Sequence, residues 1–112
     1  MSKKTRVEDW EAIDANHWIK DNAETAAIAK SEHAYLFEFR KSLKAIQCGK
    51  SDKKTEAAKE NDAYASPEYQ QLLKDIRIAS VESLRLQHLM KAAEIQFEHW
   101  RTQSANDRKG YQ

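Results

Sequence analysis

The chain has few residues at which a backbone can turn tightly. Its 112 residues include 2 Gly and 1 Pro, against average usage near 7% and 5%. Because glycine and proline are the residues that most often interrupt helices, this scarcity predicts long uninterrupted helices. A chain of this length fits one domain, and a domain this short has a thin core.

Cysteine and long apolar segments are also scarce. Cys48 is the only cysteine, so no disulfide can form within the chain, and a reducing cytosol is the expected compartment. The first residues are basic and then acidic, and no apolar stretch of about 18 residues follows anywhere. We therefore expect no signal peptide, no membrane span and a cytoplasmic protein.

Neither sign of charge is in excess. A charged fraction of 33% and a mean hydropathy of −0.91 are typical of disordered chains. However, 3 Trp, 4 Tyr and 3 Phe are side chains that gain by burial, and a net charge of +1 causes no global repulsion. The net charge gives no overall indication of nucleic-acid binding, so an electrostatic partner must meet a local patch.

The last third of the chain predicts a helix over about 67–107. Ser66, Pro67 and Glu68 supply an N-cap, a proline at the first helical position and an acid in the first turn. Steps of three and four residues from Tyr69 then reach nine positions, eight of them apolar: Leu72, Ile76, Ala79, Ser83, Leu86, Met90, Ala93, Phe97 and Trp100. This spacing is typical of a coiled-coil seam.

A first helix is predicted over about 6–47. Thr5 to Glu8 has the form of a capping box, and Gly49 provides a natural stop. A break is an alternative at residues 14–17, which form helices poorly. The predicted stripe is apolar at its far end and mixed in the middle: Ala15, Trp18, Asn22, Thr25, Ala29, Glu32, Leu36, Phe39, Leu43 and Ile46.

The residues between these helices, about 48–66, predict a basic, solvated connector. A short helix at about 52–62 is compatible with the sequence, but no apolar side chains there are expected to hold it down. Folding back within the connector sets Leu43 opposite Leu72 and brings Trp18 within a turn of Trp100. The sequence therefore predicts an all-α fold, a long antiparallel, coiled-coil-like helical hairpin in a single domain, 1–112.

A hairpin of two long helices buries only one face of each. A second apolar line lies off the main seam of the last helix: Ile78, Val81, Leu89, Ala92 and Ile95. This line favours a homodimer that forms a four-helix bundle.

The sequence predicts no catalytic residues, no metal ligands and no cofactor. Its four histidines form no His-x-x-x-His pattern, and there is no Cys-x-x-Cys, phosphate loop or nucleophile elbow. An alternative is a metal site between helices made by His17, Glu98 and His99. Cys48 lies near Lys44 and Lys50, but no partner base is visible, and the alternative to a reactive thiol is an incidental connector cysteine.

A local basic patch is predicted around the connector. Against Asp52 and Glu56 it holds seven basic residues, about +5 in total: Arg40, Lys41, Lys44, Lys50, Lys53, Lys54 and Lys59. Such a tip can bind phosphates of a nucleic acid. The alternative is a lysine-rich loop that keeps the chain soluble, and no aromatic residue lies between Arg40 and Lys59 to stack on bases.

The opposite end of the hairpin combines aromatic and charged residues. Its candidates for binding a protein partner are of the types most enriched in interface hot spots: Trp10, Trp18, Trp100, Arg101 and Arg108. The alternative is that these side chains lock the open end of the hairpin.

Part of the last helix resembles a known group of proteins. Residues 84–86, 92–102 and 105–108 read Leu-Arg-Leu, Ala-Ala-Glu-Ile-Gln-Phe-Glu-His-Trp-Arg-Thr and Ala-Asn-Asp-Arg. This stretch, in the last third of the chain, resembles the C-terminal helix of small uncharacterised proteins encoded by tailed bacteriophages. The resemblance implies a phage accessory protein in the host cytoplasm and transfers no catalytic residue.

Three functions are compatible with these patterns. The first is a non-enzymatic phage accessory protein, an inhibitor or adaptor, that binds a host or phage protein through a helical surface. The second is a nucleic-acid-binding accessory factor of recombination or replication that acts through the basic tip. The third is a virion assembly or scaffolding protein.

Overall fold

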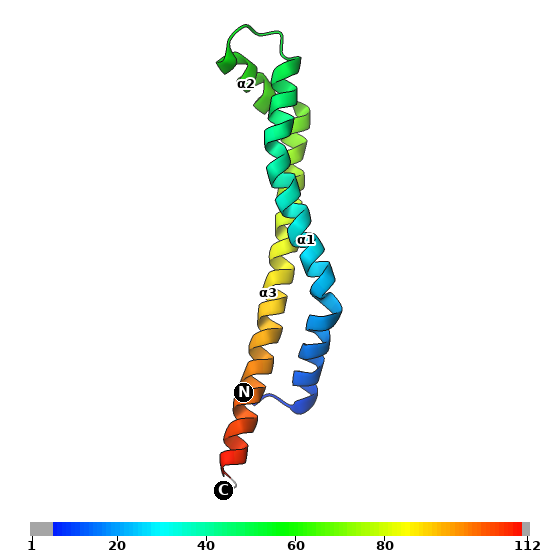
Figure 1. Cartoon of the computed structure of the whole chain (residues 1–112), viewed down its shortest axis with the longest axis vertical. Coiled ribbons are helices and arrows are strands. Elements are labelled where there is room, and N and C mark those ends of the chain that lie inside the picture. The colour runs from blue at the N-terminus through cyan, green and yellow to red at the C-terminus, as the bar shows by residue number, and fades with distance from the viewer. Residues whose placement is uncertain (1–5, 111–112) are drawn as a thin grey trace, which may run out of the picture. The chain divides into compact units, whose positions relative to one another are not determined.

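The fold was analysed in a computed structural model that describes residues 6–110. It contains three helices, α1 (Asp9–Lys50), α2 (Glu56–Ala65) and α3 (Pro67–Gly110), and no strand within the described residues (Figure 1). The predicted all-α class is confirmed.

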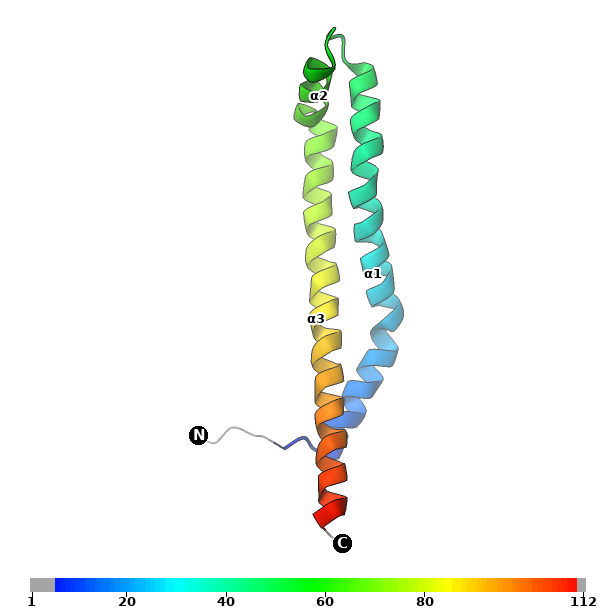
Figure 2. The ribbon, with the colours of Figure 1, turned by 60° about the vertical axis from the view of Figure 1, so that its left-hand side comes forward.

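The chain divides into two compact units. Unit 1 comprises Met1–Ala26 with Arg85–Gln112, and unit 2 comprises Ala27–Leu84. In unit 1, Glu11 contacts Gln96 and the earlier Asp9 contacts the later Trp100, so the two helices run antiparallel. In unit 2 the later part of α1 lies beside the first part of α3, and α2 makes the turn between them (Figures 1 and 2). The antiparallel helical hairpin is thus confirmed in each unit.

The covered face of α3 follows the spacing seen in the sequence. The helix begins at Pro67, and the Ser66 hydroxyl caps it by accepting a hydrogen bond from the Tyr69 amide at 3.2 Å. Tyr69, Leu72, Ser83 and Leu86 are buried, and the other seam positions are half-buried: Ile76, Ala79, Met90, Ala93, Phe97 and Trp100. The stripe therefore lies against the neighbouring helix along its whole length.

The bounds of α1 differ from the prediction. The helix begins at Asp9 rather than near residue 6, with the Glu8 carbonyl accepting from the amides of Glu11 and Ala12. Thr5, the predicted cap, lies outside the described residues. At the other end the helix continues to Lys50 and includes Gly49, and no described residue has the positive φ that a glycine stop uses. Residues 14–17 are helical without a break.

The covered stripe of α1 agrees with the prediction in part. Three predicted positions, Thr25, Glu32 and Ile46, are exposed, and the other seven are buried or half-buried: Ala15, Trp18, Asn22, Ala29, Leu36, Phe39 and Leu43. Covered positions that were not predicted include Ala12, Ile19, Ala26, His33, Arg40 and Gln47. Polar residues occupy several of them, and Asn22 satisfies its amide by donating to the Trp18 carbonyl at 2.9 Å. The sequence prediction followed apolar residues and so chose Ile46, which is 49% exposed, over Gln47, which is 9% exposed.

The connector is more ordered than the sequence suggested. The Thr55 hydroxyl caps α2 by accepting from the Ala58 amide at 3.1 Å. Ala63 is fully buried, and Tyr64 packs edge-on against Tyr69 with 5.2 Å between ring centroids. The expectation that no apolar contact holds this segment is therefore wrong. The contact with Tyr69 was not expected because Tyr69 belongs to α3 and lies outside the connector.

The core is thin. Among the described residues only six apolar residues are buried: Ala12, Ala15, Ala63, Tyr69, Leu72 and Leu86. Many large apolar side chains stay exposed, including Trp10 at 62%, Ile95 at 58% and Ile78 at 68%.

Candidate protein-binding site

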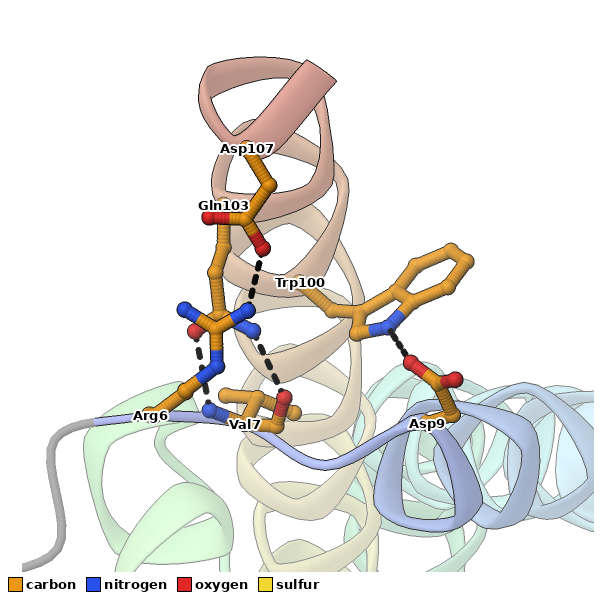
Figure 3. A network of polar contacts seen from close by, with 6 residues as sticks. All are labelled: Arg6, Val7, Asp9, Trp100, Gln103 and Asp107. Atoms are coloured by element: carbon orange, nitrogen blue, oxygen red, sulfur yellow. Dashed lines mark hydrogen bonds and ion pairs between the residues drawn. The ribbon is translucent and has the colours of Figure 1, made fainter. Parts of the chain in front are cut away.

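The end of unit 1 is closed by the segment that precedes α1, Arg6 to Glu8, which lies against α3 (Figure 3). The Val7 amide donates to the Gln103 side-chain carbonyl at 3.0 Å, and the Gln103 amide donates to the Val7 carbonyl at 2.7 Å. Arg6 forms an ion pair with Asp107, and the hydrogen bond to this carboxylate raises the pKa of Arg6. The Gln103 side chain thus satisfies both the N–H and the carbonyl of Val7, and the ion pair of Arg6 with Asp107 holds the segment against α3.

Trp100 is oriented by the same end of unit 1. Its indole N–H donates to the Asp9 carboxylate at 2.8 Å (Figure 3). Its ring also contacts Phe97, with 5.8 Å between centroids. A tryptophan held by both a hydrogen bond and ring packing has little freedom left to lose on binding, which favours its use as an anchor.

An apolar groove lies between α1 and α3 in unit 1. It has a volume of about 540 Å³ and is lined by Trp10, Glu11, Asp14, Ala15, Trp18, Leu89, Ala92, Ala93 and Gln96. Trp10 is 62% exposed, Trp18 is half-buried and Leu89 is 43% exposed. Gln96 and Glu11 join the two sides of the groove at 3.4 Å. Glu11 and Asp14 are the charged lining residues, and both belong to α1.

A second hollow lies at the end of α3 and has a different character. It has a volume of about 460 Å³ and is lined by Glu98, Trp100, Arg101, Thr102, Ser104, Ala105 and Arg108. Arg101 is paired with Glu98 at 3.1 Å, and Arg108 is exposed. We call this surface the arginine hollow.

The five residues predicted to bind a partner therefore separate into two surfaces. Trp10 and Trp18 line the groove, whereas Trp100, Arg101 and Arg108 line the arginine hollow. The predicted neighbour of Trp18 was Trp100, but Trp18 shares the groove with Leu89, and Trp100 is bonded to Asp9.

The basic tip belongs to unit 2, and three of its seven cations form ion pairs. Lys41 pairs with Glu38 at 3.4 Å, Lys44 with Glu60 at 3.3 Å and Lys59 with Glu56 at 3.9 Å. The Arg40 guanidinium lies 3.7 Å from the centroid of the Phe37 ring and donates to the Phe37 carbonyl at 2.8 Å. Within residues 6–110, Lys50, Lys53 and Lys54 make no ion pair. Of the seven predicted cations, three therefore pair with carboxylates, Arg40 packs on Phe37, and Lys50, Lys53 and Lys54 make neither contact with any described residue.

The tip also gains an aromatic residue that its sequence segment lacks. The Lys44 ammonium lies 5.1 Å from the centroid of the Tyr64 ring. Hydrogen bonding to the Tyr64 side chain and to Glu60 raises the pKa of Lys44. Tyr64 is 42% exposed and lies on α2, beyond the segment from Arg40 to Lys59.

Reactive groups do not converge in the described part of the chain. No three His, Cys, Asp or Glu side chains among these residues lie close enough to hold a metal ion, so the alternative site at His17, Glu98 and His99 is not formed. Cys48 is a half-buried free thiol. None of the helices over residues 6–110 has the length and apolar character needed to cross a membrane.

Several residues that make contacts in the two units could not be identified from the sequence. Gln103 and Asp107 are polar residues near the end of α3, and only the position of the Arg6 to Glu8 segment gives them partners. Glu60 and Asp62 on α2 were likewise not expected to meet Lys44 and Ser51. The signal that could have suggested the pair of Lys44 with Glu60 is the presence of acidic residues on α2, which follow Lys53 and Lys54 in the sequence.

Comparison of the chain with models of protein families, with curated proteins and with solved structures finds no match.

Proposed function

We propose that the chain is a non-enzymatic accessory protein that acts by binding other proteins through the end of unit 1, where the groove and the arginine hollow lie. The expected target is a host or phage protein in the host cytoplasm, since part of α3 resembles small proteins of tailed bacteriophages. Binding alone, as an inhibitor or adaptor, requires no catalytic pocket.

The observation that carries this proposal is the exposure of the groove. Trp10 and Leu89 are 62% and 43% exposed on either side of it. Burial of apolar surface is favourable by roughly 25 cal/mol per Å². A partner that covers the groove removes these side chains from water, and the polar groups at its edge give the contact specificity.

The arginine hollow supports the same function with different chemistry. Trp100 is held by Asp9, and Arg101 and Arg108 extend beside it. Tryptophan and arginine dominate the binding energy of many interfaces. Arginine side chains match the geometry of carboxylates, and Arg101 is already paired with Glu98, so Arg108 is the side chain that suits a carboxylate of a partner.

Photo-crosslinking tests the proposal. A photoreactive phenylalanine replaces Leu89 in the groove, and the matched control replaces Leu84, which is 48% exposed on α3 but does not line the groove. A second pair places the label at Arg108, in the hollow, and at the neighbouring exposed Lys109. After irradiation in bacteria that express the full chain, we expect discrete protein adducts from Leu89 or Arg108 and none from the controls. Equal labelling at all four positions, or none at any, would contradict the proposal.

A second candidate function is nucleic-acid binding through the basic tip. It is favoured by Lys50, Lys53 and Lys54, which make no ion pair within the described residues. Three phosphate contacts to a single strand predict a slope of about −2 for the logarithm of the binding constant against the logarithm of salt concentration. Binding to a fluorescent oligonucleotide should vanish in the triple variant with Lys50→Glu, Lys53→Glu and Lys54→Glu. It should persist with the same change at Lys20, Lys30 and Lys91, which lie elsewhere on the chain. Binding without salt dependence, or no binding by the unaltered chain, would exclude this function.

A further inference from the structure

The first turn of α1 contains an amide that does not use its usual helical partner. In an α-helix each N–H donates to the carbonyl four residues earlier. The Ala12 amide does so, donating to the Glu8 carbonyl at 3.2 Å, but the Glu11 amide donates to the same carbonyl, three residues earlier, at 3.1 Å. In a longer helix the partner of Glu11 would be the Val7 carbonyl, which instead accepts from Gln103 at 2.7 Å. The Val7 carbonyl can therefore serve either α1 or α3.

The sequence before Asp9 favours a helix, although the structure has none there. Thr5 to Glu8 has the form of a capping box, which places the first helical residue at Arg6. No glycine or proline occurs in residues 6–12 to oppose a helix. In the structure α1 nevertheless begins at Asp9. We call the non-helical segment Arg6 to Glu8 the strap, because it lies across α3 (Figure 3).

The contacts that hold the strap are polar and lie near solvent. The ion-paired side chains of Arg6 and Asp107 are 59% and 44% exposed, and exposed ion pairs contribute little to stability. The two hydrogen bonds between Val7 and Gln103 each have a modest net value, because both partners bond to water when they separate. Glu8 is exposed and Val7 is half-buried. A helical alternative can therefore compete with the strap.

Release of the strap leaves Gln103 and Asp107 with a partner that the structure shows elsewhere on α3. Gln71 and Asp75 have the same residue types and the same spacing, and the Gln71 amide donates to the Asp75 carboxylate at 3.0 Å. Gln103 and Asp107 can form the same bond once the strap withdraws. Neither side chain then depends on the strap for a polar partner, which lowers the cost of release.

Release also changes which part of α3 is covered. Glu11 lies beside Gln96, and both helices rise by the same distance per residue. A helix that began at Arg6 would therefore reach the level of Arg101. Ser104 lies beyond that level, and it lines both the arginine hollow and the hollow beside the strap. Withdrawal of the strap would therefore join these two hollows.

We propose that the strap is a conformational switch with two states. In one state it lies against α3, as in the structure. In the other state it adds about one turn to α1, with the Glu11 amide bonded to the Val7 carbonyl. The first state covers the surface of α3 next to the arginine hollow, and the second opens that surface as far as Asp107. The switch goes beyond the proposed function, because it is a property of the free chain.

Backbone carbon chemical shifts, measured by NMR on the full chain, test the switch. Gln103→Ala with Asp107→Asn removes the contacts made by α3 and leaves the strap sequence, with its helix propensity, unchanged. The ratio of the helical state to the strap state should rise about tenfold, so the shifts of residues 6–8 should move towards helical values. Gln71→Ala with Asp75→Asn is the matched control and should leave these shifts unchanged.

A proline identifies the added turn. Glu8→Pro keeps both backbone groups of Val7 but disfavours a helical Val7, because the residue before a proline avoids the helical region. Added to Gln103→Ala and Asp107→Asn, this change should abolish the helical shifts of the strap. Glu8→Ala in the same background is the control and should retain most of them. Circular dichroism checks that each variant is folded.

The outcomes distinguish a switch from a strap that has no second state. Unchanged shifts after replacement of Gln103 and Asp107, or a strap that becomes disordered rather than helical, would overturn the switch. Helical shifts that persist with Glu8→Pro, or an equal response in the control variant, would also overturn it. None of these results affects crosslinking from Leu89 or Arg108, so the proposed function is tested separately.

Discussion

Unit 1 and unit 2 are built from opposite ends of the same two long helices, and they differ in the surface that they offer to a partner. In unit 2, Lys44 pairs with Glu60 and Lys59 pairs with Glu56 at the basic tip. Unit 1 also has ion pairs, Arg6 with Asp107 and Arg101 with Glu98, but its groove is lined by the exposed apolar side chains Trp10 and Leu89. Burial of apolar surface favours binding more than exposed ion pairs do. The comparison supports the proposal that unit 1 binds a partner, whereas unit 2 makes the turn of the hairpin.

The two units also close their ends differently. Unit 2 turns through α2, whose N-cap is Thr55 and whose residue Ala63 is buried. Unit 1 has no such turn and uses side-chain contacts instead, with Gln103 and Asp107 holding Val7 and Arg6 (Figure 3). Closure by a helix depends on local sequence, whereas closure by side chains depends on residues about a hundred positions apart. The substitutions that follow affect, in turn, the core of unit 1, the closure of unit 1 and the turn of unit 2.

The largest effect is expected at the core of unit 1. Leu86 is 2% exposed, so Leu86→Asp removes buried apolar contacts and buries a charge that has no partner. We expect a loss of about 3 kcal/mol or more in the free energy of unfolding. Urea unfolding followed by circular dichroism measures it. Leu84→Asp, at a position that is 48% exposed, should cost about 0.5 kcal/mol or less. Equal losses in the two variants would show that the seam of α3 is wrongly assigned.

A smaller effect is expected at the closure of unit 1. Gln103→Ala removes both hydrogen bonds to Val7 and should cost about 1–2 kcal/mol locally. Amide hydrogen exchange should quicken at Val7 and remain unchanged in unit 2. Gln71→Ala is the control, because Gln71 bonds only to Asp75 on the exposed surface of α3. Unchanged exchange at Val7 would mean that these bonds do not hold the segment in solution.

The smallest effect is expected at the turn of unit 2, in alkaline solution. The folded state raises the pKa of Lys44 above its ordinary value of 10.5, through Tyr64 and Glu60. The resulting stabilisation is complete below pH 10.5 and is lost as the pH rises through the folded-state pKa. Lys44→Arg keeps a cation that does not titrate in this range, so it should flatten the alkaline decline in melting temperature. Parallel declines in the two proteins would show that Lys44 does not contribute to it.

The helices could be predicted from sequence to different degrees. On α3, apolar residues and covered positions coincide from Tyr69 to Trp100, so the spacing alone located the seam. On α1, Asn22 is covered as predicted, but Gln47 is covered while Ile46 is exposed, so the apolar pattern located the stripe only in part. A helix that presents apolar residues on two faces, one to its own hairpin and one to the groove, does not reveal from its sequence which face is which.

The candidate site could be predicted only in part. Trp10, Trp18 and Trp100 attracted notice as aromatic anchors, but their division between a groove and a hollow follows from the way α1 lies on α3. The available charge of the tip was overestimated, because Glu60 lies on α2 and reaches Lys44 only when that helix folds back.

The sequence alone determined that the chain is helical, that it turns back once, and which face of α3 is covered. Those features depend on local propensity, on caps such as Ser66 and on a regular spacing of apolar side chains. Only the tertiary structure decided where the covered face of α1 departs from its apolar residues, the contacts of Gln103 and Asp107 with the segment before α1, and the walls of the groove. These depend on which residues of two separate helices come side by side, and a periodic pattern in either helix does not specify that register.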